Sequence, residues 1–243
     1  MMHAPSPGGD LGFERPLATV DVAIFTAAGD RLQVLLAQRP DVATDPFPGR
    51  WALPGGFIDV RQDRTLLHCA RRKLKEKTGV ATPYLEQLGS WGGADRDPRG
   101  WSATHAYFAL MPFVSVRAAA PEPEEGAVPT RWAPVEEALK LRLAFDHREI
   151  LQAAVDRVRS KVEYTSLPAF LLPEPFTLPQ LQHVYEVVLG RPLDKSAFRR
   201  RMLDAGFLEE AESVAAGARV AQGYRIADRS APAVFPRTFK SAE

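Results

Sequence analysis

Two stretches of the chain decide the fold: WALPGGF at residues 51–57 and RKLKEKTGV at residues 72–80. The second stretch completes a helical pattern over residues 64–78. The apolar residues of that pattern recur at helical spacing: Leu66, Leu67, Ala70 and Leu74. Gly79 follows two lysines in the last turn, which is typical of the end of a helix. The first stretch, with its proline and paired glycines, predicts a tight loop before that helix.

Strand patterns lie on both sides of these stretches. We expect strands over residues 18–25, 32–37, 84–88, 104–113 and 128–133, and further helices over 134–140 and 146–160. Residues 41–56 hold three prolines and three glycines, so we expect mostly loop there. Strands interspersed with a few helices predict an α/β domain in which a mixed sheet is sandwiched between helices.

The pattern of the chain changes after a cluster of prolines between residues 168 and 179. Thr177 and Gln180 fit a capping box ahead of a helix that ends at Gly190. Asp194 caps a second helix over 195–205, and two short strands are expected at 207–208 and 223–226. This order predicts a winged helix-turn-helix. We therefore divide the chain into a flexible tail (1–16), an α/β domain (17–163), a winged helix domain (164–230) and a second tail (231–243).

Composition and charge narrow the class of protein. The 243 residues are 45% hydrophobic and 25% charged, close to the averages of soluble globular proteins. The longest nearly apolar run, residues 106–114, is about half of what a membrane helix needs, so we expect a cytoplasmic protein without a membrane partner. A single cysteine, Cys69, excludes an intrachain disulfide. Lys plus Arg number 31 against 30 for Asp plus Glu, so any nucleic-acid binding must come from local charge.

The two stretches resemble the Nudix box, written G-x5-E-x7-R-E-U-x-E-E-x-G-U with U apolar. The resemblance covers roughly residues 18–160 and implies a Nudix-type α/β/α sandwich, in which glutamates of the box bind magnesium. Two features depart from the motif. Arg72 lies sixteen residues after Gly56, two more than in the motif, and the early glutamate has no clear counterpart near Gln62, Asp63 or Arg64. Lys73 and Lys77 stand where the motif has metal-binding glutamates.

The two lysines bear directly on catalysis. Hydrolysis of a diphosphate at such a site needs hard oxygen ligands that hold magnesium. Residues 73 and 77 share a helix face, and at about 6 Å each ammonium group would repel a divalent ion by several kcal/mol. We therefore expect no metal, no required cofactor and a degenerate box at Arg72, Lys73, Glu76 and Lys77, with magnesium needed only if hydrolysis is retained. The lysines are either solvated helix surface or cations that help to hold a diphosphate.

A second stretch that suits a ligand is the glycine- and tryptophan-rich segment 89–101, in which arginines and aspartates alternate. Glycines let a ligand approach the backbone, arginines pair with phosphates and aromatic rings stack on bases. The alternative is a long hairpin loop held by internal Asp–Arg pairs. The candidates for binding a nucleotide effector are Arg39, Gly55, Gly56, Phe57, Lys73, Asp95, Arg96 and Arg99.

Basic residues are concentrated on the second helix of the C-terminal domain. Lys195, Arg199, Arg200 and Arg201 lie beside an apolar stripe, so one side can pack while the other enters a major groove. The alternative is a solvated charged helix in an accessory domain. The candidates for DNA contact are Thr177, Lys195, Ser196, Arg199, Arg200 and, on the wing, Arg219.

Three C-terminal stretches, residues 176–182, 189–193 and 198–201, follow a Nudix-like domain that carries Leu143-Ala144-Phe145-Asp146-His147. Together they resemble the Nudix-related transcriptional regulators. The resemblance implies a homodimer that binds operator DNA, senses ADP-ribose or a related nucleotide and represses genes of NAD metabolism. Its wing, residues 217–224, only loosely follows the pattern associated with the family.

An alternative is a magnesium-dependent hydrolase of ADP-ribose or another nucleoside diphosphate derivative. It would need metal ligands from elsewhere, such as Glu86, Asp95 or a glutamate within 122–125.

Overall fold

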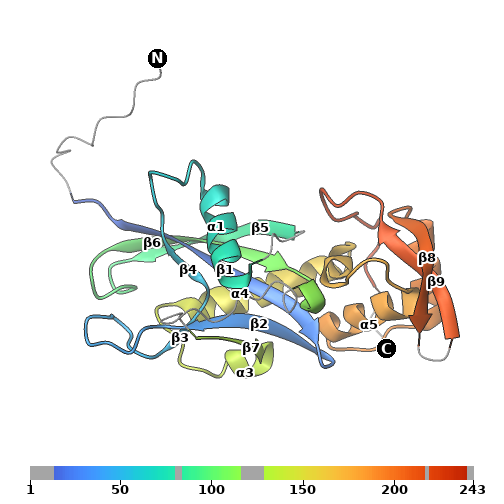
Figure 1. Cartoon of the computed structure of the whole chain (residues 1–243), viewed down its shortest axis with the longest axis horizontal. Helices are drawn as coiled ribbons and strands as arrows, with labels where there is room; N and C mark the ends of the chain where they lie inside the picture. The colour runs from blue at the N-terminus through green and yellow to red at the C-terminus, as the bar shows by residue number, and fades with distance from the viewer. Residues whose placement is uncertain (1–13, 80–83, 116–128, 217–218, 240–243) are drawn as a thin grey trace, which may run out of the picture.

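The structure is a computed structural model that describes residues 14–79, 84–115, 129–216 and 219–239. Its core is one mixed sheet with the strand order β3-β2-β1-β6-β5, in which β4 also pairs with β1 and β7 with β2 (Figure 1). The strands are β1 (Leu17–Ala28), β2 (Arg31–Gln38), β3 (Trp51–Ala52), β4 (Gly55–Phe57), β5 (Tyr84–Gly93), β6 (Ser102–Leu110) and β7 (Thr130–Pro134). β1 and β6 run parallel, whereas the other pairs are antiparallel.

Helices cover both faces of this sheet. α1 (Leu66–Thr78) packs on one face, and α3 (Val135–Ala138) and α4 (His147–Val162) belong to the other side. Alternate residues of β1 serve the two faces, since Val22 and Ile24 pack toward α1 while Ala23 and Phe25 join the cluster that contains α4. The predicted α/β/α sandwich with a mixed sheet is therefore confirmed.

The C-terminal domain has the helix-helix-hairpin order of a winged helix. It comprises the 3-10 helix η1 (Leu167–Leu171), α5 (Leu178–Leu189), α6 (Lys195–Asp204), β8 (Leu208–Ala216) and β9 (Arg219–Ile226). The capping box of α5 is present, because Thr177 Oγ1 accepts from the Gln180 backbone N–H while Gln180 Oε1 accepts from the Thr177 N–H. Its core continues into that of the α/β domain, where Phe170 packs against Tyr84 with ring centroids 5.3 Å apart.

Several boundaries differ from the sequence-based expectation. The loop expected over 41–56 contains the short strands β3 and β4, and the first residue of the strand expected over 128–133 lies outside the described residues. The wing strands are longer than the two and four residues we expected, since β8 and β9 pair from Leu208–Ile226 to Ala216–Arg219. β8 is rich in exposed glutamates and has no apolar alternation, so its pairing left no signal in the sequence.

The expectation of a C-terminal tail over 231–243 is wrong for residues 233–239, which form part of the folded core. The Phe235 and Phe239 N–H groups donate to the carbonyls of Tyr164 and Glu163, and the Ser166 N–H donates to the Ala233 carbonyl. Residues 240–243 and residues 1–13 of the other expected tail lie outside the described part of the chain. Within the described ranges, no helix is long and apolar enough to cross a membrane.

Candidate functional site

A cavity of about 200 Å³ opens between β1, β4, the loop after β5 and the start of α4. It is lined by Thr19, Asp21, Arg39, Leu53, Gly55, Gly56, Phe57, Arg96, Asp97, Arg99, Phe145 and His147. The structure thus brings together six of the eight predicted effector residues. Lys73 lies at the edge, because a Cβ built on Gly56 would be 3.3 Å from its Nζ. Asp95 is exposed and lies outside the lining.

Arg96 joins two carboxylates at the base of the cavity. Its Nη2 donates to Asp21 at 3.2 Å and its Nε donates to Asp146 at 2.8 Å. Burial alone would raise the pKa of Asp21, but His147, Thr104 and Arg96 outweigh burial and hold that pKa below its ordinary value. The guanidinium is only 6% exposed, so a buried ion triad fixes the loop after β5 against β1 and the start of α4.

A backbone contact fixes the orientation of the His147 ring. Its Nδ1 accepts from the Leu53 N–H at 2.9 Å, so the proton of the neutral ring lies on Nε2. Nε2 is 3.4 Å from Asp21 Oδ2. The first residue of α4 therefore holds both the backbone before β4 and the buried carboxylate.

Phe145 occupies a strained backbone position among cations. Its φ of +53° lies in the left-handed region, which is costly for a bulky side chain. The Arg39 and Arg96 guanidinium carbons lie 5.0 and 5.6 Å from the ring centroid, and Phe47 meets the ring edge-on at 4.5 Å. Packing from three sides thus keeps the ring in the cavity wall.

The loop between β5 and β6 combines internal and external ion pairs. Arg99 donates to the buried Asp97 at 2.7 Å, and its guanidinium lies 5.2 Å from the Phe57 ring centroid. The internal Asp–Arg pairing considered as an alternative is therefore present at Arg99. Arg96 instead reaches out of the loop to other elements, so this loop forms one wall of the cavity.

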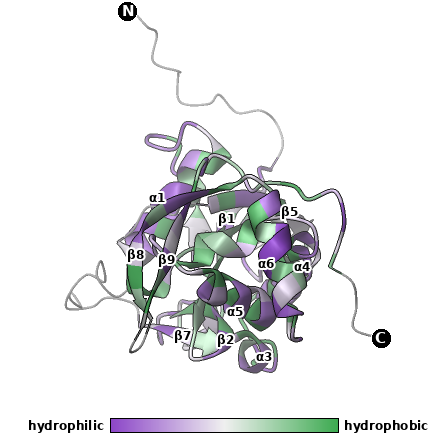
Figure 2. Cartoon of the chain, turned by 90° about the vertical axis from the view of Figure 1, so that its right-hand side faces the viewer, coloured by the Kyte–Doolittle hydropathy of each residue, from purple (hydrophilic) through white to green (hydrophobic). Residues whose placement is uncertain are grey.

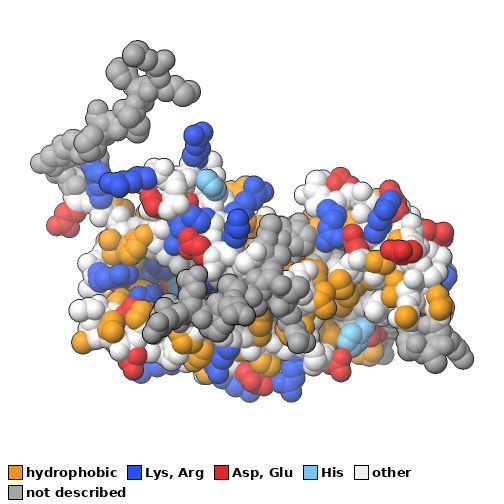
Figure 3. Space-filling view, viewed as in Figure 1, with side chains coloured by type: hydrophobic (Ala, Val, Ile, Leu, Met, Phe, Trp, Pro, Cys, Tyr) orange, Lys and Arg blue, Asp and Glu red, His pale blue; other side chains and the backbone are white. Residues whose placement is uncertain are grey.

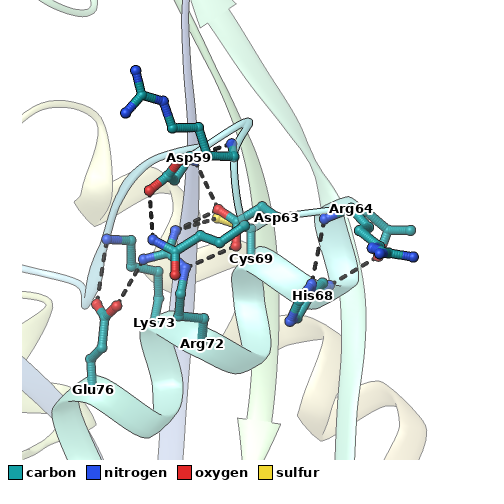
Figure 4. A network of polar contacts seen from close by, with 11 residues as sticks. Asp59, Asp63, Arg64, His68, Cys69, Arg72, Lys73 and Glu76 are labelled. Carbon is teal, nitrogen blue, oxygen red and sulfur yellow. Dashed lines mark hydrogen bonds and ion pairs between the residues drawn. The ribbon is translucent and has the colours of Figure 1, made fainter. Parts of the chain in front are cut away.

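The helix that carries the box, α1, takes part in a network of ion pairs and hydrogen bonds (Figure 4). Arg72 binds Asp63 through two nitrogens, at 2.8 and 2.5 Å, and also donates to Glu76 at 2.8 Å. Asp63 thus pairs with the arginine of the box from the loop before the helix, nine residues earlier in the chain.

The donor set around α1 does not fit magnesium. Lys73 Nζ lies 3.4 Å from Glu76 Oε2, so Glu76 is neutralised by Arg72 and Lys73. No group of three or more His, Cys, Asp or Glu side chains in the described residues could hold a metal ion. Glu86 is paired with Lys161 and Arg157 from α4. The glutamates within 122–125 lie outside the described part.

Cys69 is buried between α1 and the sheet. Burial, with Asp63 nearby, raises the pKa of its thiol to about 11. The thiol is therefore protonated at neutral pH, as expected for a packed residue rather than a nucleophile.

The basic helix of the winged domain, α6, is exposed along most of its length (Figure 2). Phe198 and Met202 are buried, which confirms the expected apolar stripe. The predicted DNA-contact residues on α6 are all exposed: Lys195, Ser196, Arg199 and Arg200. The basic side chains of the molecule also gather over α1, which lies toward the other end of the chain's long axis (Figure 3).

Two other DNA-contact candidates fare differently. Thr177 is 2% exposed and its hydroxyl caps α5, so the structure gives it a capping role, which argues against a side-chain contact with DNA. Arg219 begins β9, but its side chain lies outside the described part of the structure. On the same hairpin, Arg225 donates to Glu209 at 2.8 Å.

Sequence reasoning missed Asp21, Phe145 and His147, which line the cavity, and Asp146, which pairs with Arg96. Asp21 carried a weak signal, as a lone acid within an apolar strand. The other three were noted only as part of a resemblance, and no local pattern shows that they turn toward Asp21.

Comparisons with known proteins agree with both halves of this architecture. The NUDIX domain matches residues 16–154, and the NrtR DNA-binding winged helix domain matches residues 168–226. The chain is 49% identical over 226 residues to the ADPR responsive transcriptional repressor NtrR of Acinetobacter baylyi, covering 93% of this chain and 88% of that relative.

Two solved structures are similar as well. NrtR of Shewanella oneidensis complexed with a 27mer DNA is 40% identical, with a TM-score of 0.82, and covers 92% of this chain and 99% of its own. The NUDIX domain of that protein complexed with ADP ribose is also 40% identical, with a TM-score of 0.54, covering 63% and 94%. The chain therefore belongs to the NrtR-type family of Nudix-related regulators, in which a Nudix domain precedes a winged helix domain.

Proposed function

We propose that this protein is a transcriptional repressor that binds operator DNA through its winged helix domain and senses ADP-ribose or a related nucleotide in its Nudix cavity. One observation carries the proposal. The same chain holds an arginine-lined Nudix cavity, with no metal-binding donor set among the described residues, and an exposed basic helix on a winged domain. The name of the Acinetobacter relative and the DNA and ADP ribose complexes of the Shewanella protein support it.

The cavity offers positive charge to a diphosphate from several directions. Arg39, Arg99 and Lys73 lie around the Gly55-Gly56 turn, which brings bare backbone to the cavity wall, while Asp21 and Val20 fill the space beside Gly55. Guanidinium groups bind phosphate oxygens through two parallel hydrogen bonds, and an ammonium group acts as a point charge. We assign diphosphate binding to these three cations, while Phe57 borders the outer part of the cavity.

DNA binding is assigned to α6. With Phe198 and Met202 packed inward, the opposite side presents Arg199 and Arg200 for a major groove, with Lys195 and Ser196 near the start of the helix. Arg219 would contact the backbone of the DNA from the wing. A homodimer bound to a two-fold operator, controlling genes of NAD metabolism in the cytoplasm, completes the proposal.

Ligand and DNA binding are then linked. A nucleotide that binds one arrangement of the two domains better than the other changes the DNA affinity by the same factor as DNA changes the nucleotide affinity. The test is a gel shift with a duplex selected by the full chain from a random pool, with and without ADP-ribose. Absence of sequence-specific binding, or binding that no adenine nucleotide alters, contradicts the proposal.

Hydrolysis is not part of the proposed activity. Lys73 and Lys77 occupy the ligand positions, and Glu76 is held by Arg72 and Lys73. We expect ADP-ribose to bind equally well with magnesium or with EDTA, and to remain intact. The hydrolase alternative predicts turnover by the unaltered protein at ordinary enzyme rates with magnesium, and turnover that appears only in the Lys73→Glu/Lys77→Glu double variant supports the degenerate site.

A further inference from the structure

Helix α4 runs from the nucleotide cavity to the winged helix domain. Asp146, which precedes its first residue, is held by Arg96, while its second oxygen is buried without a hydrogen-bond partner among the described residues. Sixteen residues at 1.5 Å per residue carry the helix about 24 Å from that point. Arg96 also lines the cavity, so its bond to Asp146 connects the cavity wall to the start of α4.

The far end of α4 is where the DNA-binding elements converge. The Glu163 carboxylate pairs with Arg191, in the turn between α5 and α6, at 3.0 Å. The Tyr185 hydroxyl, from α5, donates to the Thr165 carbonyl at 2.8 Å. Residues 163–166 therefore act as a common anchor point for α5 and for the turn that leads into α6.

Residues 233–239, which we name the C-terminal strap, are fastened to this anchor point by main-chain hydrogen bonds. The Phe235 N–H donates to Tyr164 at 2.7 Å, the Phe239 N–H donates to Glu163 at 3.1 Å and the Ser166 N–H donates to Ala233 at 2.9 Å. These hydrogen bonds join main-chain atoms, so they hold the strap to the end of α4 independently of its side chains.

The strap meets α6 through aromatic rings and through the Arg201 side chain in the contacts that the structure describes. The Phe239 ring stacks on Phe198, with centroids 6.1 Å apart and planes 14° apart. The Arg201 guanidinium lies 4.0 Å from the centroid of Phe239 and 4.8 Å from that of Phe235. Arg201 also donates to the carbonyls of Arg237 and of Glu163 itself.

Arg201 therefore differs from its neighbours on the same helix. Arg199 and Arg200 are exposed, whereas Arg201 is half-buried between α6, the strap and the end of α4. A cavity of about 590 Å³ separates the strap from the turn before α6 and from the adjacent face of that helix. The contacts between the strap and α6 are thus concentrated at a few side chains beside this cavity.

We propose that Arg201 is a positioning residue that, through the C-terminal strap, ties α6 to the end of α4 and transmits nucleotide occupancy of the cavity to the DNA-binding helix. This inference rests on the proposed function. Arg201 contacts neither ligand. It sets where α6 lies when α4 responds to the cavity.

The experiment compares single substitutions in the full chain. The operator duplex is selected as above, and its dissociation constant is measured by fluorescence anisotropy with and without saturating ADP-ribose. Couplings between two ligands of a protein commonly amount to about 5- to 150-fold. We expect Arg201→Met to bring the ratio of the two constants to within about twofold of one, with Arg201→Lys restoring part of the response because a cation over the rings is kept.

Arg200→Met is the matched control, since it removes the same charge one residue earlier on an exposed side chain. It should weaken DNA binding similarly with and without ADP-ribose and so preserve the ratio. Val234→Ala, in the strap but 74% exposed, should leave both constants unchanged. Calorimetry with ADP-ribose should give the same affinity for every variant.

The outcomes separate the inference from the proposed function. A wild-type protein that fails to bind ADP-ribose or DNA overturns the proposed function and the inference with it. A responsive wild type together with a fully responsive Arg201→Met protein overturns the inference alone. Should Arg201→Met not fold, as judged by circular dichroism, Phe239→Leu decides in its place: a retained wild-type ratio refutes the strap and a reduced one supports it.

Discussion

Replacing Arg96 by Met removes the guanidinium between Asp21 and Asp146 while keeping much of its apolar length. Both carboxylates lie within hydrogen-bond distance of Arg96, and the three side chains are 6%, 7% and 18% exposed. Removing one partner of a buried ion pair costs about 3–5 kcal/mol, because the remaining charge stays buried without compensation. For a chain of this size that corresponds to a fall in Tm of about 6–20 °C.

The loss of stability caused by Arg96→Met should depend on pH in a defined direction. In the wild type the pKa of Asp21 lies below 3.8, so its charge contributes stability at neutral pH that is lost as the pH falls through the folded-state pKa. Without Arg96 that pKa rises, and the variant takes up a proton at higher pH than the wild type does. The difference in unfolding free energy is therefore full at pH 7 and narrows below about pH 5.

Urea unfolding of both proteins at pH 7 and pH 4.5 checks this reasoning. The matched control is Arg31→Met, which breaks an ion pair of the same 2.8 Å length with Glu137 but with both side chains more than half exposed. Exposed pairs contribute about 0–1 kcal/mol, so the control should be nearly neutral. An Arg96→Met protein as stable as the control, or a difference that does not change with pH, would refute the ionic account of the cavity base.

Three further predictions concern packing and capping. Gly55→Ala should destabilise the protein by about 1–3 kcal/mol in urea unfolding, because the added Cβ would lie 1.9 Å from Asp21 Oδ1; Gly93→Ala, with open space around it, is the control. Cys69, with a thiol pKa of about 11, should be about one part in a thousand thiolate at pH 8, so the folded protein should react slowly with Ellman's reagent. Reaction of the folded protein at the rate of a free thiol would contradict the burial of Cys69. Thr177→Val should lower the Tm, because about 1 kcal/mol of capping energy is lost. The DNA affinity of the folded variant, measured by anisotropy, should stay the same. A loss of DNA affinity in the folded variant would instead support Thr177 as a DNA contact.

Features with local causes could be predicted from the sequence. The end of α1 at Gly79, the capping box at Thr177 and the buried stripe of α6 each depend on residues within one or two helical turns. Periodicity and capping act at that range, so a single sequence contains the necessary signal. The same holds for the Gly55-Gly56 turn, whose glycines the structure places against the cavity.

Features that depend on distant parts of the chain could not be predicted from the sequence. Arg96 finds its two carboxylates 75 and 50 residues away in the chain, and nothing in segment 89–101 distinguishes it from Arg99, which pairs two residues away. The C-terminal strap is similar, since its backbone bonds reach back to residues 163–166. The strap lacks periodic apolar residues and depends on contacts with a distant part of the chain, so its sequence resembles that of an unstructured tail.

In the box on α1, the residues that hold the helix in place differ from those at the positions of the metal ligands. The pairing of Asp63 with Arg72 and the burial of Leu74 hold the helix against the sheet without any metal. Lys73, beside Gly56, then places a fixed positive charge at the edge of the cavity, oriented by Glu76. A cation built into the chain attracts a diphosphate without supplying an activated water, whereas a bound magnesium ion does both. Because these lysines oppose a metal ion on electrostatic grounds, the residues at 73 and 77 favour the proposal that the ligand is held intact.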